Sequence, residues 1–188
     1  METNTKTQSI IIWNVDPSHS HITFKVRHMM ISYVNGEIKE YDLKVETTGE
    51  DFSSAKISFS ANPDSITTGS EQRDGHLLSD DFFNTEKFPA MTFKGNSLMH
   101  VGDDHWTLQG DITIRDVTQP ISLQANYMGK MDDPWGNTRV GFEVNGKINR
   151  KEFGLKWDVV TEAGGIVVSD EVRIHCNLEF IREKTANS

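Results

Sequence analysis

Apolar and polar residues alternate along most of the chain. In residues 22–26, apolar Ile22, Phe24 and Val26 are separated by single polar residues. Successive side chains of a β-strand point to opposite faces, so this period of two predicts a strand with one buried and one solvated face. The same pattern recurs in residues 106–114, 121–127, 140–148 and 172–180. Continuous apolar runs, which are typical of a parallel sheet covered on both faces, are missing.

Residues that favour turns separate these runs. They are Asp16-Pro17, Asn35-Gly36, Asn62-Pro63-Asp64, Asp132-Asp133-Pro134 and Gly164-Gly165. Many strands with short connections and one-sided burial predict an antiparallel meander, and closing it into a barrel removes the exposed sheet edges. The apolar phase changes between Ile38 and Tyr41, which predicts a β-bulge that bends the strand there. The expected fold class is therefore an all-β antiparallel barrel.

One segment, about residues 70–88, interrupts the strand pattern. Thr68 and Glu71 have the spacing of a helix capping box. Between Gln72 and Lys87 the alternation is lost, so we expect one or two short helices that end at Phe88-Pro89. Inserted between two strands of a barrel, such a helical segment would cover one mouth.

Length and charge narrow the possible functions. The 188 residues fit one domain, which we place at residues 10–183, with disordered tails at 1–9 and 184–188. The 19 basic and 28 acidic residues give a net charge of −9. This charge argues against nucleic acid as a partner and against electrostatic docking on an acidic membrane. The single cysteine, Cys176, shares the phase of an apolar run and is expected to be buried.

Targeting signals also bear on the location. The first ten residues are polar and lack the apolar centre of a secretory signal, so we expect a cytoplasmic protein rather than a periplasmic one. A membrane-spanning helix needs about 20 apolar residues. The chain has no such run, so no transmembrane segment is expected.

Several motifs occur in one order between Trp13 and Phe180. They are Asp16-Pro17-Ser18-His19-Ser20, Phe24-Lys25-Val26-Arg27-His28, Arg73-Asp74-Gly75-His76-Leu77-Leu78-Ser79-Asp80-Asp81-Phe82-Phe83, Phe88-Pro89-Ala90-Met91-Thr92-Phe93-Lys94 and Ile148-Asn149-Arg150-Lys151-Glu152-Phe153-Gly154. In these the chain resembles the YceI-like family of lipocalin-like polyisoprenoid-binding proteins, from which it departs at Asp116. The resemblance implies an eight-stranded barrel with a long apolar channel. It also implies binding of a polyprenyl or quinone-type isoprenoid lipid, often by a homodimer.

The residues predict which side chains line such a channel. A barrel of eight strands either fills its interior with side chains or holds one ligand, and the pattern alone leaves both open. The resemblance favours the ligand. The expected apolar lining comprises Phe24, Val26, Phe59, Leu77, Phe82, Phe83, Phe93, Leu108, Ile112, Ile114, Leu123, Phe142, Val144 and Ile174, with Leu178 in the same phase.

Simple magnitudes limit the length of the ligand. Each buried CH₂ group contributes about 0.8 kcal/mol, whereas association costs about 4–15 kcal/mol. A chain of roughly ten methylenes barely offsets this cost. We therefore expect a long prenyl chain rather than a short fatty acid as the ligand.

Five polar residues are candidates for holding a lipid head group at a mouth of the barrel. His28 and Arg150 continue the inward phase of their strands, and Arg73, Asp74 and His76 lie in the helical segment. A head group needs donors of this kind. The alternative for each residue is a structural role, such as a hydrogen bond from His28 to the backbone or an ion pair of Arg73 with a carboxylate.

The sequence gives little support for a metal site, a cofactor site or a catalytic site. His19 and His21 share the solvated face of a strand, so we expect no metal site, and we expect no cofactor. A nucleophile elbow, a phosphate-binding loop and a zinc-protease motif are missing. Trp135 is interpreted as a loop anchor. We expect a binding protein and not an enzyme. Two alternatives stay open: an enzyme acting on the lipid head group through His28, His76 or Asp74, and an interaction module whose barrel is full.

Overall fold

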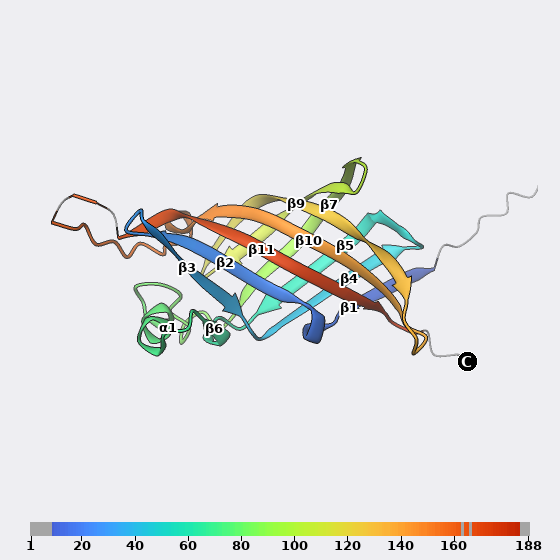
Figure 1. Ribbon diagram of the computed structural model, residues 1–188, viewed down its shortest axis with the longest axis horizontal. Coiled ribbons are helices and arrows are strands. Elements are labelled where there is room, and N and C mark those ends of the chain that lie inside the picture. Colours follow the sequence, from blue (N-terminus) through green and yellow to red (C-terminus); the bar gives the residue numbers. More distant parts are fainter. Residues whose placement is uncertain (1–8, 163, 166, 185–188) are drawn as a thin grey trace, which may run out of the picture.

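The computed structural model describes residues 9–162, 164, 165 and 167–184. The tails predicted at 1–9 and 184–188 lie almost wholly outside the described residues. Strands dominate the described part, and neighbouring strands pair antiparallel throughout (Figure 1). The strands are β1 (Ile10–Val15), β2 (His21–His28), β3 (Ser32–Ile38), β4 (Tyr41–Thr48), β5 (Asp51–Ala61), β6 (Ile66–Thr67), β7 (Met91–Gly102), β8 (His105–Ile114), β9 (Val117–Asp132), β10 (Thr138–Asn149) and β11 (Val168–Arg182).

These segments build a closed barrel of eight strands, which confirms the predicted fold class. β1 and β2 act as one strand because both pair with β11, where Val15 lies opposite Phe180 and His21 opposite Asn177. The 3₁₀ turn η1 (Pro17–His19) separates them. β3 and β4 likewise act as one strand of the barrel. β5 and β6 also act as one strand, interrupted by the 3₁₀ turn η2 (Pro63–Ser65). Pairing of β1 with both β4 and β11 closes the barrel.

The phase change predicted between Ile38 and Tyr41 is a break between β3 and β4. The backbone N–H groups of Lys39 and Glu40 both donate to the Ser65 hydroxyl, at 3.2 and 2.9 Å. Ser65 thus satisfies the donors that leave the strand ladder. Ile38 and Leu43 both face the interior in spite of their opposite parity.

The turn predicted at Asn35-Gly36 is wrong, because both residues lie inside β3. Gly36 pairs with Phe24 of β2, and a Cβ atom at this glycine would lie 2.2 Å from the Phe24 ring. The glycine is required for packing across strands and not for a turn. The chain reverses earlier instead, at Met29 and Met30, both of which have positive φ.

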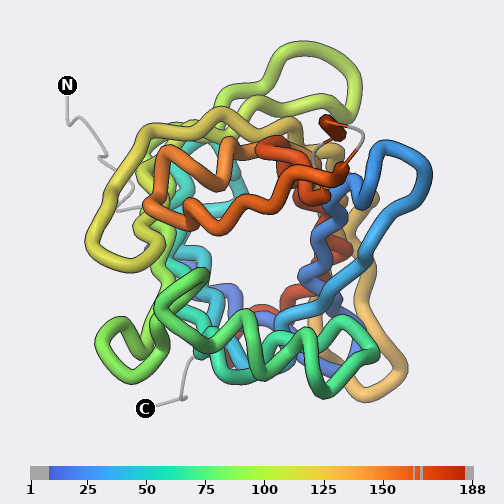
Figure 2. Tube along the Cα trace, turned by 90° about the vertical axis from the view of Figure 1, so that its left-hand side faces the viewer, coloured from blue at the N-terminus to red at the C-terminus, as the bar shows by residue number. Residues whose placement is uncertain are grey.

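The helical segment is confirmed in place but is shorter than predicted. Helix α1 (Glu71–Leu78) begins after the N-cap Ser70, whose hydroxyl accepts from the Arg73 N–H, so the capping box predicted at Thr68 is wrong by two residues. Turns follow up to the start of β7. One end of the barrel, which we call the mouth, is surrounded by α1, the β2–β3 hairpin and the 3₁₀ turn η3 (Arg150–Phe153) with the connection to β11 (Figures 1 and 2).

The opposite end, which we call the floor end, contains the start of β1 and the β9–β10 turn (Figure 1). Among the described residues, α1 is the longest helix, and no helix has the length and apolar character needed to cross a bilayer.

Candidate functional site

The barrel encloses an apolar cavity of about 830 Å³. Inward-facing side chains of the strands form its wall, because alternate residues of each strand point to the interior. Every residue of the predicted apolar lining borders this cavity, including Leu77, Phe82 and Phe83 from the helical segment. Leu178 and the predicted buried residue Cys176 also border it. Burial raises the pKa of the Cys176 thiol to about 12, so the thiol is protonated at neutral pH.

Aromatic rings form the floor of the cavity. The Phe52 ring contacts the rings of Trp13 and Phe142, with centroids 5.4 and 5.2 Å apart. Phe142 in turn contacts Tyr127 and Phe180. Trp13 is fully buried, and its indole N–H donates to the Thr47 hydroxyl at 3.1 Å. Because these rings pack against one another and most of them are buried, they block the floor end, and we expect a ligand to enter from the mouth.

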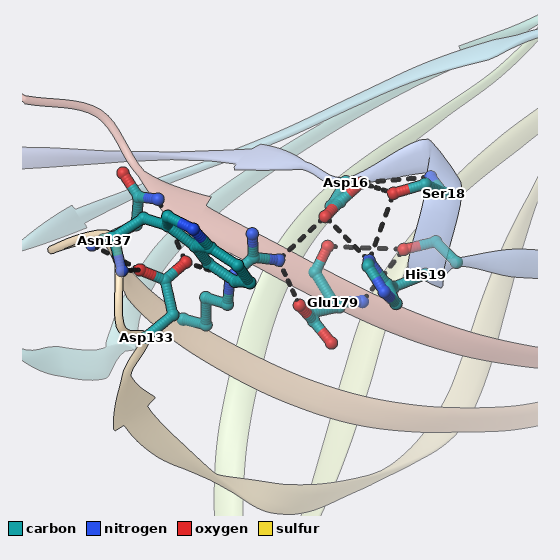
Figure 3. A network of polar contacts seen from close by, with 9 residues as sticks. Asp16, Ser18, His19, Asp133, Asn137 and Glu179 are labelled. Atoms are coloured by element: carbon teal, nitrogen blue, oxygen red, sulfur yellow. Dashed lines mark hydrogen bonds and ion pairs between the residues drawn. The ribbon is translucent and has the colours of Figure 1, made fainter.

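A polar network centred on Arg139 lies near this floor and connects β10, β11, the β9–β10 turn and the residue that follows β1 (Figure 3). The Arg139 guanidinium of β10 contacts Asp16 at 2.8 Å, Asp133 at 2.7 Å, and Glu179 of β11. Burial opposes ionisation of Asp16, but hydrogen bonds from Ser18, Arg139 and His19 outweigh it, so its pKa is well below the ordinary value. Asp133 behaves in the same way because Arg139 and Asn137 donate to it.

This network also bears on metal binding. Among the described residues, Asp16, His19 and Glu179 form a group whose ligand atoms lie within 4.8 Å of one another. The Arg139 cation already contacts both carboxylates of this group, and it neutralises the charge that would attract a metal ion.

Three aromatic rings cover one side of the mouth. The His76 ring of α1 lies edge-on to Phe82 and Trp157, with centroids 5.1 and 5.3 Å apart. His76 also pairs with Asp81 at 2.8 Å. Because Trp157 belongs to the connection before β11, this contact joins two segments that are far apart in the sequence. The predicted head-group residue His76 thus borders the cavity as part of a lid.

Arg115 fastens the same lid to the barrel. It lies at positive φ in the two-residue turn between β8 and β9, the turn that contains Asp116. Its guanidinium donates to the backbone carbonyls of Asp80, Phe82 and Gly154 at 3.1–3.2 Å and pairs with the Asp80 carboxylate. No signal in the sequence pointed to this residue, because its partners lie on two segments far from it along the chain.

Arg150 also borders the cavity, but four of the five N–H donors of its guanidinium are bound to the backbone, and the group pairs with Asp170 at 3.5 Å. Only 2% of the residue is exposed, and burial lowers the pKa of its guanidinium below the ordinary value. It donates to four backbone carbonyls at 2.7–3.2 Å, those of Leu155, Trp157, Val168 and Ser169. The geometry favours the structural role for Arg150 over contact with a head group.

The other predicted polar residues divide into two groups. His28 and Arg73 border the cavity, and the His28 ring has no hydrogen-bond partner within the described residues. Arg73 donates to the hydroxyl and carbonyl of Thr68, and no carboxylate of the described residues pairs with it. Asp74 does not border the cavity, which corrects its prediction as a head-group residue. Its carboxylate accepts from Thr67 and Thr68, and these bonds lower its pKa in spite of burial.

Many residues beyond the predicted set border the cavity, including three in the segments around the mouth. Leu155 and Trp157 border the cavity from the connection before β11, and Gln72 borders it from α1. The alternation of Leu155 and Trp157 after Gly154 was a signal that could have revealed the first two. Trp135 is 77% exposed, so its interpretation as a loop anchor is wrong.

Comparison with known proteins agrees with this geometry. The model of the YceI-like domain family matches residues 13–180. "Protein YceI" of Escherichia coli O17:K52:H18 is 35% identical over 166 residues, which cover 88% of this chain and 83% of that protein.

Solved structures with the same fold include the Campylobacter jejuni YceI protein. Its TM-score is 0.72 at 29% identity, and the match covers 85% of this chain and 90% of that one. A polyisoprenoid-binding domain from Saccharophagus degradans gives a TM-score of 0.65 at 15% identity, covering 91% and 98% of the two chains. At that identity the second likeness shows the fold alone.

Proposed function

This chain belongs to the YceI-like domain family, and on this basis we propose that its barrel binds one long-chain isoprenoid lipid. The tail occupies the cavity and the head group stays at the mouth. The observation that carries the proposal is the apolar cavity of about 830 Å³, closed at one end by aromatic rings. The polyisoprenoid-binding domain of Saccharophagus degradans, which has the same fold, supports this class of ligand.

The volume of the cavity sets the length of the tail. If a methylene group takes up about as much space as a liquid water molecule, ~30 Å³, the cavity holds on the order of 25–30 carbon atoms. Burying about 25 such carbons gives on the order of 20 kcal/mol before costs, which exceeds the ~4–15 kcal/mol lost on association. A tail of about five or six isoprene units therefore fits best.

The mouth offers donors for a head group with oxygen acceptors. His28 borders the cavity from β2, and Arg73 borders it from α1. Gln72 precedes Arg73 in α1 and also borders the cavity. Imidazole, guanidinium and amide N–H groups all donate to the carbonyl of a quinone or to a phosphate. These three residues, and not Arg150 or Asp74, are the proposed head-group contacts.

The proposed mechanism is sequestration without a covalent step. The barrel supplies an apolar environment for the tail, and the mouth residues orient the head. The alternative, an enzyme that acts on the head group through His28, His76 or Asp74, requires turnover of the lipid, and an enzyme that uses His28 would lose turnover in His28→Ala while the tail still binds. An interaction module with a full barrel is disfavoured by the volume of the cavity.

Extraction of the purified protein with organic solvent, followed by mass spectrometry, tests the proposal. Ala125 is buried and faces the cavity, whereas Gln124 is exposed on the same strand, β9. Ala125→Phe narrows the channel and is expected to abolish the co-purifying isoprenoid, while Gln124→Phe retains it. Urea unfolding shows whether both variants are folded. Failure to find an isoprenoid in any variant, together with failure of added prenyl lipid to bind, would overturn the proposal.

A further inference from the structure

Exposed apolar side chains gather on two segments beside the mouth. Met29, Met30 and Ile31, at the tip of the β2–β3 hairpin, are 45, 50 and 84% exposed. Val159 and Val160, in the connection before β11, are 44 and 65% exposed. We call these five residues the mouth patch. Single exposed apolar residues are ordinary on a protein surface, but a group of them next to the opening of an apolar cavity marks an interaction surface.

Hydrogen bonds join the two segments of the mouth patch into one surface. The Met29 N–H donates to the Val167 carbonyl at 2.8 Å, and the Val167 N–H donates to the Val159 carbonyl at 3.1 Å. The hairpin and the connection lie together at the same end of the barrel (Figures 1 and 2). His28, the neighbour of Met29, borders the cavity, so the patch continues directly from the cavity wall.

The backbone at the hairpin tip has a conformation that methionine disfavours. Met29 and Met30 have φ of 48° and 60°, and the Ile31 N–H donates to the His28 carbonyl at 3.2 Å. Two central residues at positive φ are the pattern of a type I′ turn, for which Asn-Gly is the preferred sequence. Non-glycine residues at positive φ are strained. Two exposed methionines at such positions point to a role in binding rather than in stability.

A tyrosine and two basic residues lie next to the hairpin tip on β2 and β3. Tyr33 is 44% exposed, and the cations of Lys25 and Arg27 lie 5.2 and 5.9 Å from the centre of its ring. An apolar tip followed by tyrosine and basic residues matches the order of the lipid interface, where aromatic and basic side chains reach the head groups. Glu162, two residues after Val160, is exposed, and the chain carries a net charge of −9. A zwitterionic surface therefore suits the patch better than an anionic one.

From this arrangement we infer that the mouth patch docks on a zwitterionic lipid bilayer and inserts its apolar side chains at the interface. Docked in this way, the opening of the cavity faces the membrane, and a lipid tail passes between bilayer and barrel without crossing water. This role in transfer rests on the proposed function, but insertion of the patch does not require a bound ligand.

Flotation with phosphatidylcholine vesicles tests the inference. The variant M30S/I31S removes the two most exposed side chains of the hairpin tip, and we expect it to bind vesicles at least about tenfold more weakly than the unmodified chain. The matched control is M128S/M131S, because Met128 and Met131 are 69 and 72% exposed on β9 near the floor end. The control is expected to bind like the unmodified chain.

Three results would overturn the inference. They are an unmodified chain that does not float with the vesicles, equal vesicle binding by the unmodified chain and M30S/I31S, and loss of binding only in M128S/M131S. Sedimentation velocity tests a second copy of the chain as the occupant of the patch. A dimer that M30S/I31S converts to a monomer, with vesicle binding unchanged, would assign the patch to that interface instead.

Binding of a water-soluble fluorescent prenyl compound, measured without vesicles, separates the inference from the proposed function. M30S/I31S is expected to retain this binding. Prenyl binding without vesicle binding contradicts docking alone, and vesicle binding without prenyl binding contradicts the proposed lipid ligand alone.

Discussion

At the scale of single residues, Arg150 shows how one side chain holds the mouth together. Its guanidinium donates to four backbone carbonyls of the segments around η3 and the start of β11. A lysine ammonium has three donors on a flexible stem and does not reproduce this fixed geometry. We expect Arg150→Lys to lower the free energy of unfolding by about 1–3 kcal/mol, because buried carbonyls lose their donors.

Urea unfolding measures this loss, with Arg173→Lys as the control. Arg173 is an exposed strand residue that pairs with Glu171, and its replacement by lysine is expected to change the free energy of unfolding by less than about 1 kcal/mol. An Arg150→Lys variant as stable as the control would contradict the structural role of Arg150.

The sequence predicted the apolar residues of the site better than the polar ones. The period of two assigned Phe24, Phe142 and Ile174 to the interior, because strand geometry fixes the side of every second residue. It could not separate His28 from Arg150, which have the same phase. The difference lies in the partners of Arg150, which come from another segment of the chain and are fixed only by the tertiary fold.

At the scale of elements, the β2–β3 hairpin combines strain with exposure. The variant M29N/M30G supplies the preferred type I′ sequence and removes two exposed methionines. We expect it to raise the free energy of unfolding by about 0.5–2 kcal/mol and at the same time to weaken vesicle binding. Thermal unfolding and vesicle flotation on the same preparation measure the two effects. A variant that is less stable than the unmodified chain would show that the methionine turn is not strained.

Element boundaries were predicted less well than the elements themselves. Asn35-Gly36 has the composition of a turn, yet the space needed by the Phe24 ring places Gly36 inside β3. The capping box at Thr68 fitted the spacing rule, but the Thr68 hydroxyl and N–H bind Asp74, and Ser70 caps α1. In both cases a contact with another element decided between local alternatives.

At the scale of the whole molecule, the Arg139 network connects the end of β1 to β10 and β11 and makes stability depend on pH. The pKa values of Asp16 and Asp133 are lower in the folded protein than their ordinary value of 3.8. The unfolded chain therefore binds protons more readily, so stability rises with pH in this range. The stabilisation that the ionised Asp16 and Asp133 carboxylates contribute is complete above about pH 5 and is lost as the pH falls through 3.8 and below.

Urea unfolding between pH 7 and pH 3 checks this linkage. Asp16→Asn is expected to be less stable than the unmodified chain at pH 7 and to lose less stability on acidification. Asp103→Asn, in the exposed β7–β8 turn at a residue with positive φ, is the control and is expected to follow the unmodified chain. If the free energies of unfolding of Asp16→Asn and the control depend on pH in the same way, the Arg139 network does not cause the pH dependence of stability.

The cavity of the whole molecule is proposed to hold a long isoprenoid tail. Titration of delipidated protein with prenyl alcohols of ten, twenty and thirty carbons tests it most directly. We expect little binding of the ten-carbon compound, and an affinity that rises more than about tenfold to twenty carbons before it levels off near thirty, where the cavity of about 830 Å³ is full. Equal affinity for all three lengths, or tightest binding of the ten-carbon compound, would contradict it.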